Sequence, residues 1–174
     1  MKIQDGYMPF KNYRTYYRVV GENTSGKAPL LLLHNYFELL DSLANEGRQI
    51  ISYDQLGCGN SFVEGRPELW TMETWIEELQ ALRCHLNLDR IHILGQSWGG
   101  MMVIAYLIDH CPEGIQSAIL SSTLSSSELW SHEQHRLISF MPEHEQAAIA
   151  EAERTGNWES AEYLAANDHY TVRH

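Results

Sequence analysis

Short apolar runs alternate with longer amphipathic segments over the first 120 or so residues of the chain. Three runs are apolar at nearly every position, which predicts strands buried on both faces: Leu30–Leu33, Ile50–Tyr53 and Ile91–Leu94. A fourth such strand is predicted over Ile115–Leu120, and aromatic and β-branched residues predict another over Tyr13–Val20. Strands separated by helical segments are typical of a mostly parallel sheet flanked by helices, so the predicted fold class is α/β.

Apolar residues at helical spacing mark the segments between these strands. The predicted helices are Tyr36–Glu46, a helix that begins at Thr71 or Thr74, and Met101–Ile108. The second of them has one apolar stripe, which consists of Trp75, Leu79, Leu82 and Leu86. The spacing of Thr74 and Glu77 matches a capping box at its start.

After Ser121 the strands stop and only helices follow. Three are predicted, over Glu128–Phe140, Pro142–Arg154 and Trp158–Asn167. Nine acidic and three basic residues give this stretch a charge of −6. We therefore predict an α/β core over residues 1–121 and an all-helical insertion with the character of a lid over residues 122–174.

Composition narrows the class of protein. Hydrophobic residues make up 44% of the chain and charged residues 20%, as in ordinary globular proteins. No apolar run approaches the roughly 20 residues that cross a bilayer, and the N-terminus has no secretory signal, so we expect a cytoplasmic protein with no membrane partner. The net charge of −11 repels nucleic acid and favours a small cationic or neutral partner. The oligomeric state is left open.

A G-x-S-x-G pattern lies between a predicted strand and a predicted helix, as Gly95-Gln96-Ser97-Trp98-Gly99. That setting is the nucleophile elbow, in which a serine sits on a sharp turn, and it favours this interpretation over a Gly/Ser turn without chemistry. Ser97 is the predicted nucleophile, and the backbone N–H of Trp98 is the predicted oxyanion donor at a helix N-terminus. The turn itself is formed by the residues around the serine, Gly95, Gln96, Gly99 and Gly100. A Cβ atom at Gly95 or Gly99 would crowd it.

These residues, together with the loop Tyr53-Asp54-Gln55-Leu56-Gly57-Cys58-Gly59-Asn60-Ser61, resemble the bacterial proline iminopeptidases (prolyl aminopeptidases) and L-amino acid amidases of the α/β-hydrolase superfamily. The resemblance extends over essentially the whole chain, and the Trp after the serine narrows it to this family. It implies an α/β-hydrolase core with a helical lid. It also implies a serine aminopeptidase that removes an N-terminal residue, preferentially proline, from a short peptide or amino-acid amide through an acyl-enzyme.

The chain departs from the family pattern in two places. His34 runs directly into Asn35, whereas the family has a Gly-Gly-Pro-Gly loop there that supplies a second oxyanion donor. The family is also longer, and its catalytic Asp and His follow two further strands. We therefore expect the C-terminal strands and the partner Asp and His to be absent from this sequence, with residues 1–121 the N-terminal part of the core and residues 122–174 the first part of the lid.

The acid–histidine pairs within the chain are poor substitutes for that base. Asp109 and His110 lie about eleven residues along a helix from Gly99, some 16 Å away at about 1.5 Å per residue. Asp168 and His169 are neighbours on a helix and diverge by about 100°.

Two other functions stay open on the sequence. One is an esterase or lipase that uses the same elbow on uncharged esters, and the other is a non-catalytic α/β-hydrolase-like binding protein. No cofactor is expected, because Phe62 stands where a dinucleotide fingerprint starting at Gly57 needs a small residue. No metal is expected either, since His132 and His135 are more typical of a solvated helix face than of a zinc site.

Overall fold

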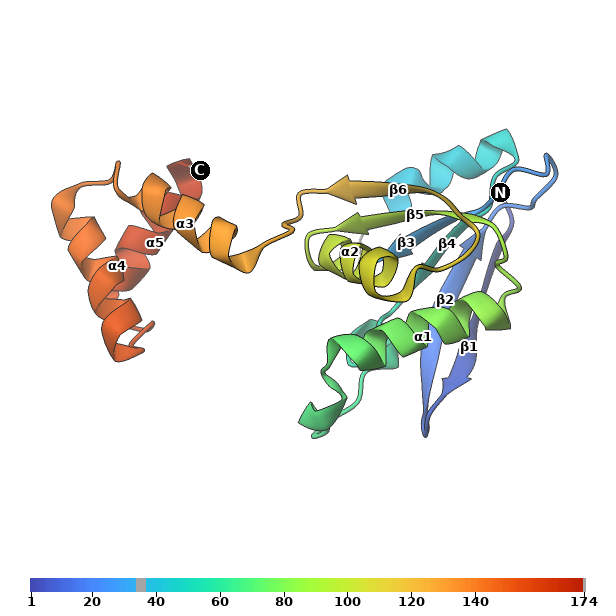
Figure 1. Ribbon diagram of the computed structural model, residues 1–174, viewed down its shortest axis with the longest axis horizontal. Helices are drawn as coiled ribbons and strands as arrows, with labels where there is room; N and C mark the ends of the chain where they lie inside the picture. The colour runs from blue at the N-terminus through green and yellow to red at the C-terminus, as the bar shows by residue number, and fades with distance from the viewer. Residues whose placement is uncertain (34–36, 174) are drawn as a thin grey trace. The chain divides into compact units, whose positions relative to one another are not determined.

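The computed structural model describes residues 1–33 and 37–173, and it divides the chain into two compact units, Met1–Ser125 and Ser126–His174 (Figure 1). The junction at His34 and Asn35, where the sequence departs from the family pattern, lies outside the described residues. Among the helices that are described, none has the length and apolar character needed to cross a membrane.

The first unit is built on a six-stranded sheet with the strand order β1-β2-β4-β3-β5-β6. The strands are β1 Ile3–Phe10, β2 Tyr13–Val20, β3 Leu30–Leu33, β4 Ile50–Tyr53, β5 Ile91–Gln96 and β6 Ile115–Ser121. The β1–β2 and β2–β4 pairs are antiparallel, whereas β4, β3, β5 and β6 run parallel to one another. The prediction of a mostly parallel sheet is therefore confirmed.

Both faces of the sheet are covered, which is why β3 is apolar at every position. All four of its residues are buried: Leu31 and Leu33 join the larger core cluster, whereas Leu30 and Leu32 join the smaller one. Helices α1 (Met72–His85) and α2 (Trp98–His110) pack on the larger cluster, and η1 packs on the smaller one, on the opposite face (Figure 1). The 3₁₀ segments are η1 Phe37–Glu46, η2 Gly59–Ser61 and η3 Pro67–Leu69.

Three details of this unit differ from the sequence-based predictions. Strand β1 was not predicted, because Gly6 and Pro9 interrupt its pattern; Met8 is nonetheless buried against the core. The predicted helix at 36–46 is a 3₁₀ helix over its described part. Its apolar residues therefore do not line up on one face as they would in an α-helix, and Leu39 is 88% exposed. The capping box at Thr74 is wrong, because the N-cap of α1 is Thr71, whose hydroxyl accepts from the Thr74 N–H.

The second unit consists of three helices, α3 (Ser127–Ile138), α4 (Glu143–Thr155) and α5 (Ala161–Arg173). They enclose a small core formed by Met141, Ile149 and Ala166. The predicted start of the last helix at Trp158 is wrong by three residues. The Asn157 side chain accepts from the Glu159 N–H and holds a turn, and the Ser160 hydroxyl accepts from the first turn of the helix that follows.

Candidate active site

Ser97 lies between β5 and α2, at the carboxyl end of an interior parallel strand. Because β5 ends at Gln96 and α2 begins at Trp98, the serine is the single residue between them. Its backbone angles are φ 50° and ψ −118°, which residues with a side chain rarely adopt. The residue is exposed, and its hydroxyl makes no hydrogen bond that caps the helix. The structure therefore presents this hydroxyl on a strained strand-to-helix turn.

Two glycines make that turn possible by letting backbone segments approach closely. A Cβ atom on Gly95 would lie 2.3 Å from the carbonyl oxygen of Gly99. A Cβ atom on Gly100 would lie 2.5 Å from the Cβ of Thr123. Both distances are too short for any side chain, so the crowding predicted at Gly95 is present, and Gly99 provides the opposing backbone.

The peptide groups on either side of Ser97 are fixed by hydrogen bonds. Its N–H donates to the carbonyl of Ser121 at the end of β6, at 3.0 Å. Its carbonyl accepts from the Thr123 hydroxyl at 2.7 Å and from the Gly100 N–H at 3.0 Å. The strained conformation is therefore held from both directions, and the bonds that hold it use the backbone of Ser97 and not its hydroxyl. The sequence analysis did not identify Thr123, because it lies 26 residues away and its contact depends on the β5–β6 pairing.

Trp98 is the first residue of α2. Peptide N–H groups in the first turn of a helix have no partner within the helix and lie at the positive end of its dipole. The indole ring of Trp98 packs edge to face against Trp75 of α1, with ring centroids 5.3 Å apart and planes at 80°. This contact fixes the orientation of the residue that follows the serine.

The loop after β4 lies at the same edge of the sheet as Ser97, because β4, β3 and β5 are parallel. The Asp54 carboxylate accepts from the backbone N–H of Asn60 at 2.7 Å and from its amide at 2.8 Å. The Ser61 hydroxyl accepts from the N–H of Tyr16 in β2, at 2.8 Å. Gly57 has φ +94° and sits against the Trp70 ring, so no other residue fits there. Hydrogen bonds and close packing therefore hold the loop over residues 53–61 in place at this edge of the sheet.

The described histidines of the first unit lie away from Ser97. His92 is five residues earlier on β5, about 16 Å along an extended strand, and bonds with Ser117. His110 ends α2, roughly 20 Å along that helix. His85 packs against the ring of Tyr17 at the end of α1, about 15 Å along that helix from Trp75, the residue that contacts Trp98. None of these three can take the serine proton, which agrees with the rejection of Asp109 and His110 from the sequence.

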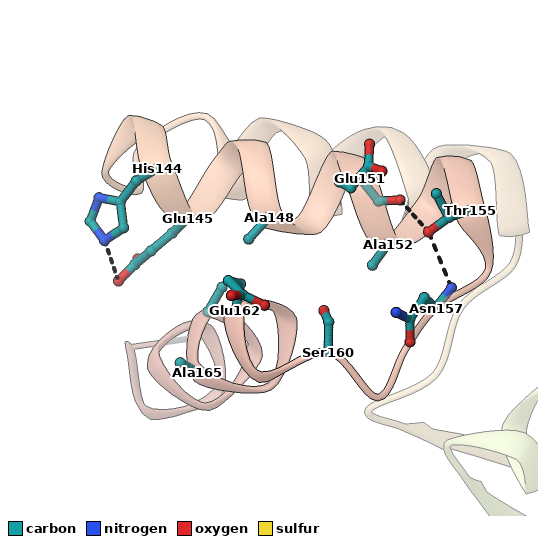
Figure 2. Close-up of a pocket in the computed structure, with 11 residues that line it drawn as sticks. His144, Glu145, Ala148, Glu151, Ala152, Thr155, Asn157, Ser160, Glu162 and Ala165 are labelled. Carbon is teal, nitrogen blue, oxygen red and sulfur yellow. Dashed lines mark hydrogen bonds and ion pairs between the residues drawn. The ribbon is translucent and has the colours of Figure 1, made fainter.

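The second unit contains a cavity of about 540 Å³ between α4 and α5 (Figure 2). Its floor is made of small residues, with Ala148 and Ala152 from α4 opposite Ala165 from α5. Two of its carboxylates are already paired: Glu151 binds Arg154, and Glu145 binds His169.

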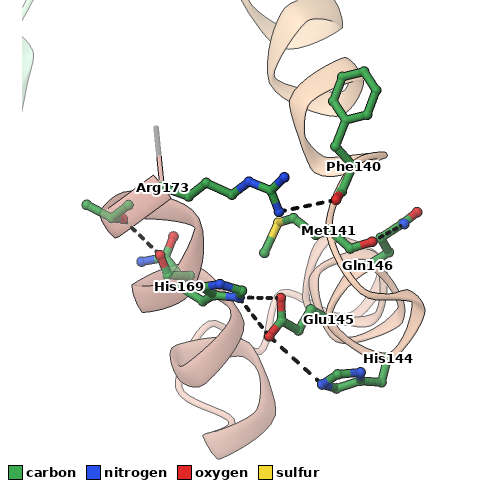
Figure 3. A network of polar contacts seen from close by, with 9 residues as sticks. Phe140, Met141, His144, Glu145, Gln146, His169 and Arg173 are labelled. Atoms are coloured by element: carbon green, nitrogen blue, oxygen red, sulfur yellow. Dashed lines mark hydrogen bonds and ion pairs between the residues drawn. The ribbon is translucent and has the colours of Figure 1, made fainter.

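Glu145 is the centre of a polar network that joins α4 to α5 (Figure 3). Its carboxylate is only 16% exposed and lies 2.8 Å from Nδ1 of His169, with His144 at 3.9 Å on its other side. His169 therefore pairs with Glu145 and not with Asp168.

In residues 1–33 and 37–173, no group of three or more His, Cys, Asp or Glu side chains is arranged to hold a metal ion. His135, which the sequence analysis considered together with His132, contacts the Ser131 carbonyl and the Glu153 carboxylate.

Comparison with known proteins places this geometry among hydrolases. Residues 30–157 match a family model described as the alpha/beta hydrolase fold. A proline iminopeptidase of Clostridioides difficile (strain 630) is 60% identical over 177 residues, which cover 98% of this chain and 60% of that protein. A proline iminopeptidase of Lactobacillus helveticus (strain DPC 4571) is 58% identical over 183 residues, which cover 100% of this chain and 62% of the relative.

Solved structures agree with the sequence comparisons. The crystal structure of proline iminopeptidase from Mycobacterium smegmatis superposes with a TM-score of 0.83 at 31% identity, and the match covers 98% of this chain and 61% of that one. The crystal structure of VinJ gives a TM-score of 0.84, also at 31% identity, with the same coverage of each chain. The chain thus spans about 60% of the length of the curated relatives it matches.

Proposed function

The chain belongs to the alpha/beta hydrolase fold family, and from this premise we propose that it acts as a serine aminopeptidase on short peptides or amino-acid amides with a free N-terminus, preferentially those that begin with proline. The observation that carries the proposal is Ser97, an exposed hydroxyl on a strained turn between β5 and α2. The preference for proline rests on the similarity to proline iminopeptidases at 58–60% identity.

The proposed chemistry begins when the Ser97 hydroxyl oxygen attacks the scissile carbonyl carbon and its proton passes to a histidine base. The backbone N–H of Trp98 stabilises the oxyanion of the tetrahedral intermediate. Collapse of the intermediate expels the amine, which takes the proton, and leaves an ester on Ser97. Water then hydrolyses this acyl-enzyme. The described histidines of the first unit do not supply the base, so the proposed activity depends on a histidine and a carboxylate other than these.

In this proposal the two units have different roles. The first unit is the N-terminal part of the α/β-hydrolase core and presents the elbow. The second unit is the first part of a helical lid, and its excess of carboxylates favours a substrate that carries a cationic amine.

Replacement of the nucleophile tests the proposal directly. Ser97→Ala should lower kcat for a chromogenic prolyl amide by at least about 10⁴-fold and abolish labelling by a fluorophosphonate, because the Ser97 oxygen carries the acyl group in this mechanism. The control is Ser42→Ala, which removes an exposed hydroxyl from η1 and should leave both readouts unchanged.

Three outcomes would contradict the assignment. Full turnover by Ser97→Ala would exclude the serine as the nucleophile. Faster hydrolysis of acetyl esters than of prolyl esters by the unaltered protein would indicate an esterase instead, because only the aminopeptidase needs the free amine. A folded protein that neither turns over substrate nor reacts with the fluorophosphonate would be a binding protein.

A further inference from the structure

Two side chains from one turn of α1 bind the backbone of Leu56, one at its N–H and the other at its carbonyl. The two carboxylate oxygens of Glu78 each lie 3.0 Å from the Leu56 N–H, and the indole N–H of Trp75 donates to the Leu56 carbonyl at 3.1 Å. Trp75 and Glu78 are three residues apart, so they project from the same side of the helix. Leu56 belongs to the loop after β4, and its own side chain is completely buried.

Glu78 is an unusual residue for a position with no access to solvent. It also accepts a hydrogen bond from the Thr15 hydroxyl of β2, and among the described residues its partners are Thr15 and the Leu56 N–H, neither of which is a cation. Burial raises the pKa of Glu78 to about 7, against the opposing effect of the Leu56 and Thr15 hydrogen bonds. A buried carboxylate without a cationic partner costs stability even when it is hydrogen-bonded, so we look for a role of Glu78 beyond packing.

The same helix turn reaches the elbow. The ring of Trp75 packs edge to face on Trp98, the residue after Ser97, at a centroid distance of 5.3 Å. Trp75 therefore connects two parts of the candidate site, since its N–H holds the loop and its ring supports Trp98.

We propose that Trp75 and Glu78 are positioning residues that clamp the Leu56 peptide and, through Trp98, fix the backbone donor that stabilises the oxyanion. This inference rests on the proposed function of Ser97. The clamp contains one titratable charge, Glu78. The titratable groups that face it are Tyr53 of β4 and Cys58 of the loop. Burial, followed by the Glu78 charge, raises the pKa of Tyr53, and burial, followed by the charges of Asp54 and Glu78, raises the pKa of Cys58, so both stay neutral near pH 7. Protonation of Glu78 removes one hydrogen-bond acceptor from the clamp and loosens the Leu56 contact.

The test compares Glu78→Gln and Trp75→Phe with Glu77→Gln. The control removes the same charge from the neighbouring position on α1, where Glu77 is exposed and pairs with Lys11. Both clamp variants should lower kcat for a prolyl amide by about 10- to 100-fold with KM changed less than about twofold, because the loss falls on the transition state. Glu77→Gln should match the unaltered protein.

A spectroscopic readout tests the clamp without any turnover. The near-ultraviolet circular dichroism of the Trp75–Trp98 pair should change with a midpoint near pH 7 in the unaltered protein and in Glu77→Gln. The change should be absent in Glu78→Gln, and the signal of the pair should be lost in Trp75→Phe. If Glu78→Gln does not fold, Trp75→Phe still removes one arm of the clamp while keeping an aromatic ring in place.

The two hypotheses fail in different ways. A protein without turnover or fluorophosphonate labelling would overturn the proposed function, and the spectroscopic titration would then decide the clamp alone. Unchanged kcat in both variants, or a pH-dependent tryptophan signal that persists in Glu78→Gln, would overturn the clamp while leaving Ser97 as the nucleophile.

Discussion

At the scale of single residues, the strain at Ser97 is balanced by contacts of its own backbone. A positive φ at a residue with a side chain costs on the order of 1–2 kcal/mol. The hydrogen bonds from Ser97 to Ser121 and from Thr123 to Ser97 hold the conformation that causes this cost. Their effect depends on how closely the flanking backbone can approach, which is the contribution of Gly95 and Gly100.

Gly95→Ala tests this argument. The added methyl group would lie 2.3 Å from the Gly99 carbonyl oxygen, and that atom belongs to the backbone and cannot rotate away. We expect a loss of about 3 kcal/mol or more in the free energy of unfolding. Gly156→Ala is the control, because Gly156 has φ +72° with open space around it, so only the conformational cost of about 1 kcal/mol applies. Equal losses in urea denaturation of the two variants would contradict the steric explanation.

The part of this site that could be predicted from the sequence is the part formed by residues close together along the chain. The order strand, Gly95, Ser97, helix is contained in about ten residues, so the turn could be predicted. Thr123 and Glu78 could not be predicted in the same way, because their contacts join segments that meet only after the sheet has formed. Glu78 also stands beside Glu77 in a pattern typical of a solvated helix face.

At the scale of elements, helix α4 is linked to both of its neighbours by histidine–glutamate pairs. His135 of α3 lies 3.1 Å from Glu153. His169 of α5 lies 2.8 Å from Glu145, as Figure 3 shows. The helices themselves were predicted from periodicity, whereas these links were not, since helical spacing does not tell which faces meet. The hydrogen bond of His135 to the Ser131 carbonyl, followed by its contact with Glu153, raises the pKa of His135.

The link between α3 and α4 should therefore depend on pH. Because the folded-state pKa of His135 is raised, its stabilising contribution is complete below the unfolded value of about 6.5 and is lost as the pH rises through the folded value. The pair is half exposed, so the effect is under about 1 kcal/mol. Amide-exchange protection factors of α3 in the whole chain should fall as the pH rises above about 6.5, and Glu153→Gln should flatten this dependence. Glu159→Gln, an exposed change in the turn before α5, should retain it.

At the scale of the whole molecule, the chain combines an α/β unit with a helical unit, and both carry excess negative charge. The change in rhythm after Ser121 predicted an architectural boundary, and the contacts divide the chain after Ser125. Strand β1 shows the limit of such patterns, because an antiparallel edge strand interrupted by Gly6 and Pro9 becomes recognisable only through its pairing with β2. The net charge of −11 surrounds the whole molecule with a negative electrostatic field, which does not depend on any single contact.

That charge predicts how salt changes the reaction of cationic substrates. A negative field accelerates the encounter with a prolyl amide that carries a protonated amine, and salt screens this attraction over a Debye length of about 10 Å at 0.1 M. Raising NaCl from about 20 mM to about 300 mM should lower kcat/KM for the cationic amide by about two- to fivefold. The rate of labelling by an uncharged fluorophosphonate should stay the same, because that reagent reacts at the same serine without a charge. If salt slowed both reactions equally, the effect would lie in the site and not in the field, and the preference for a free amine would lose its electrostatic explanation.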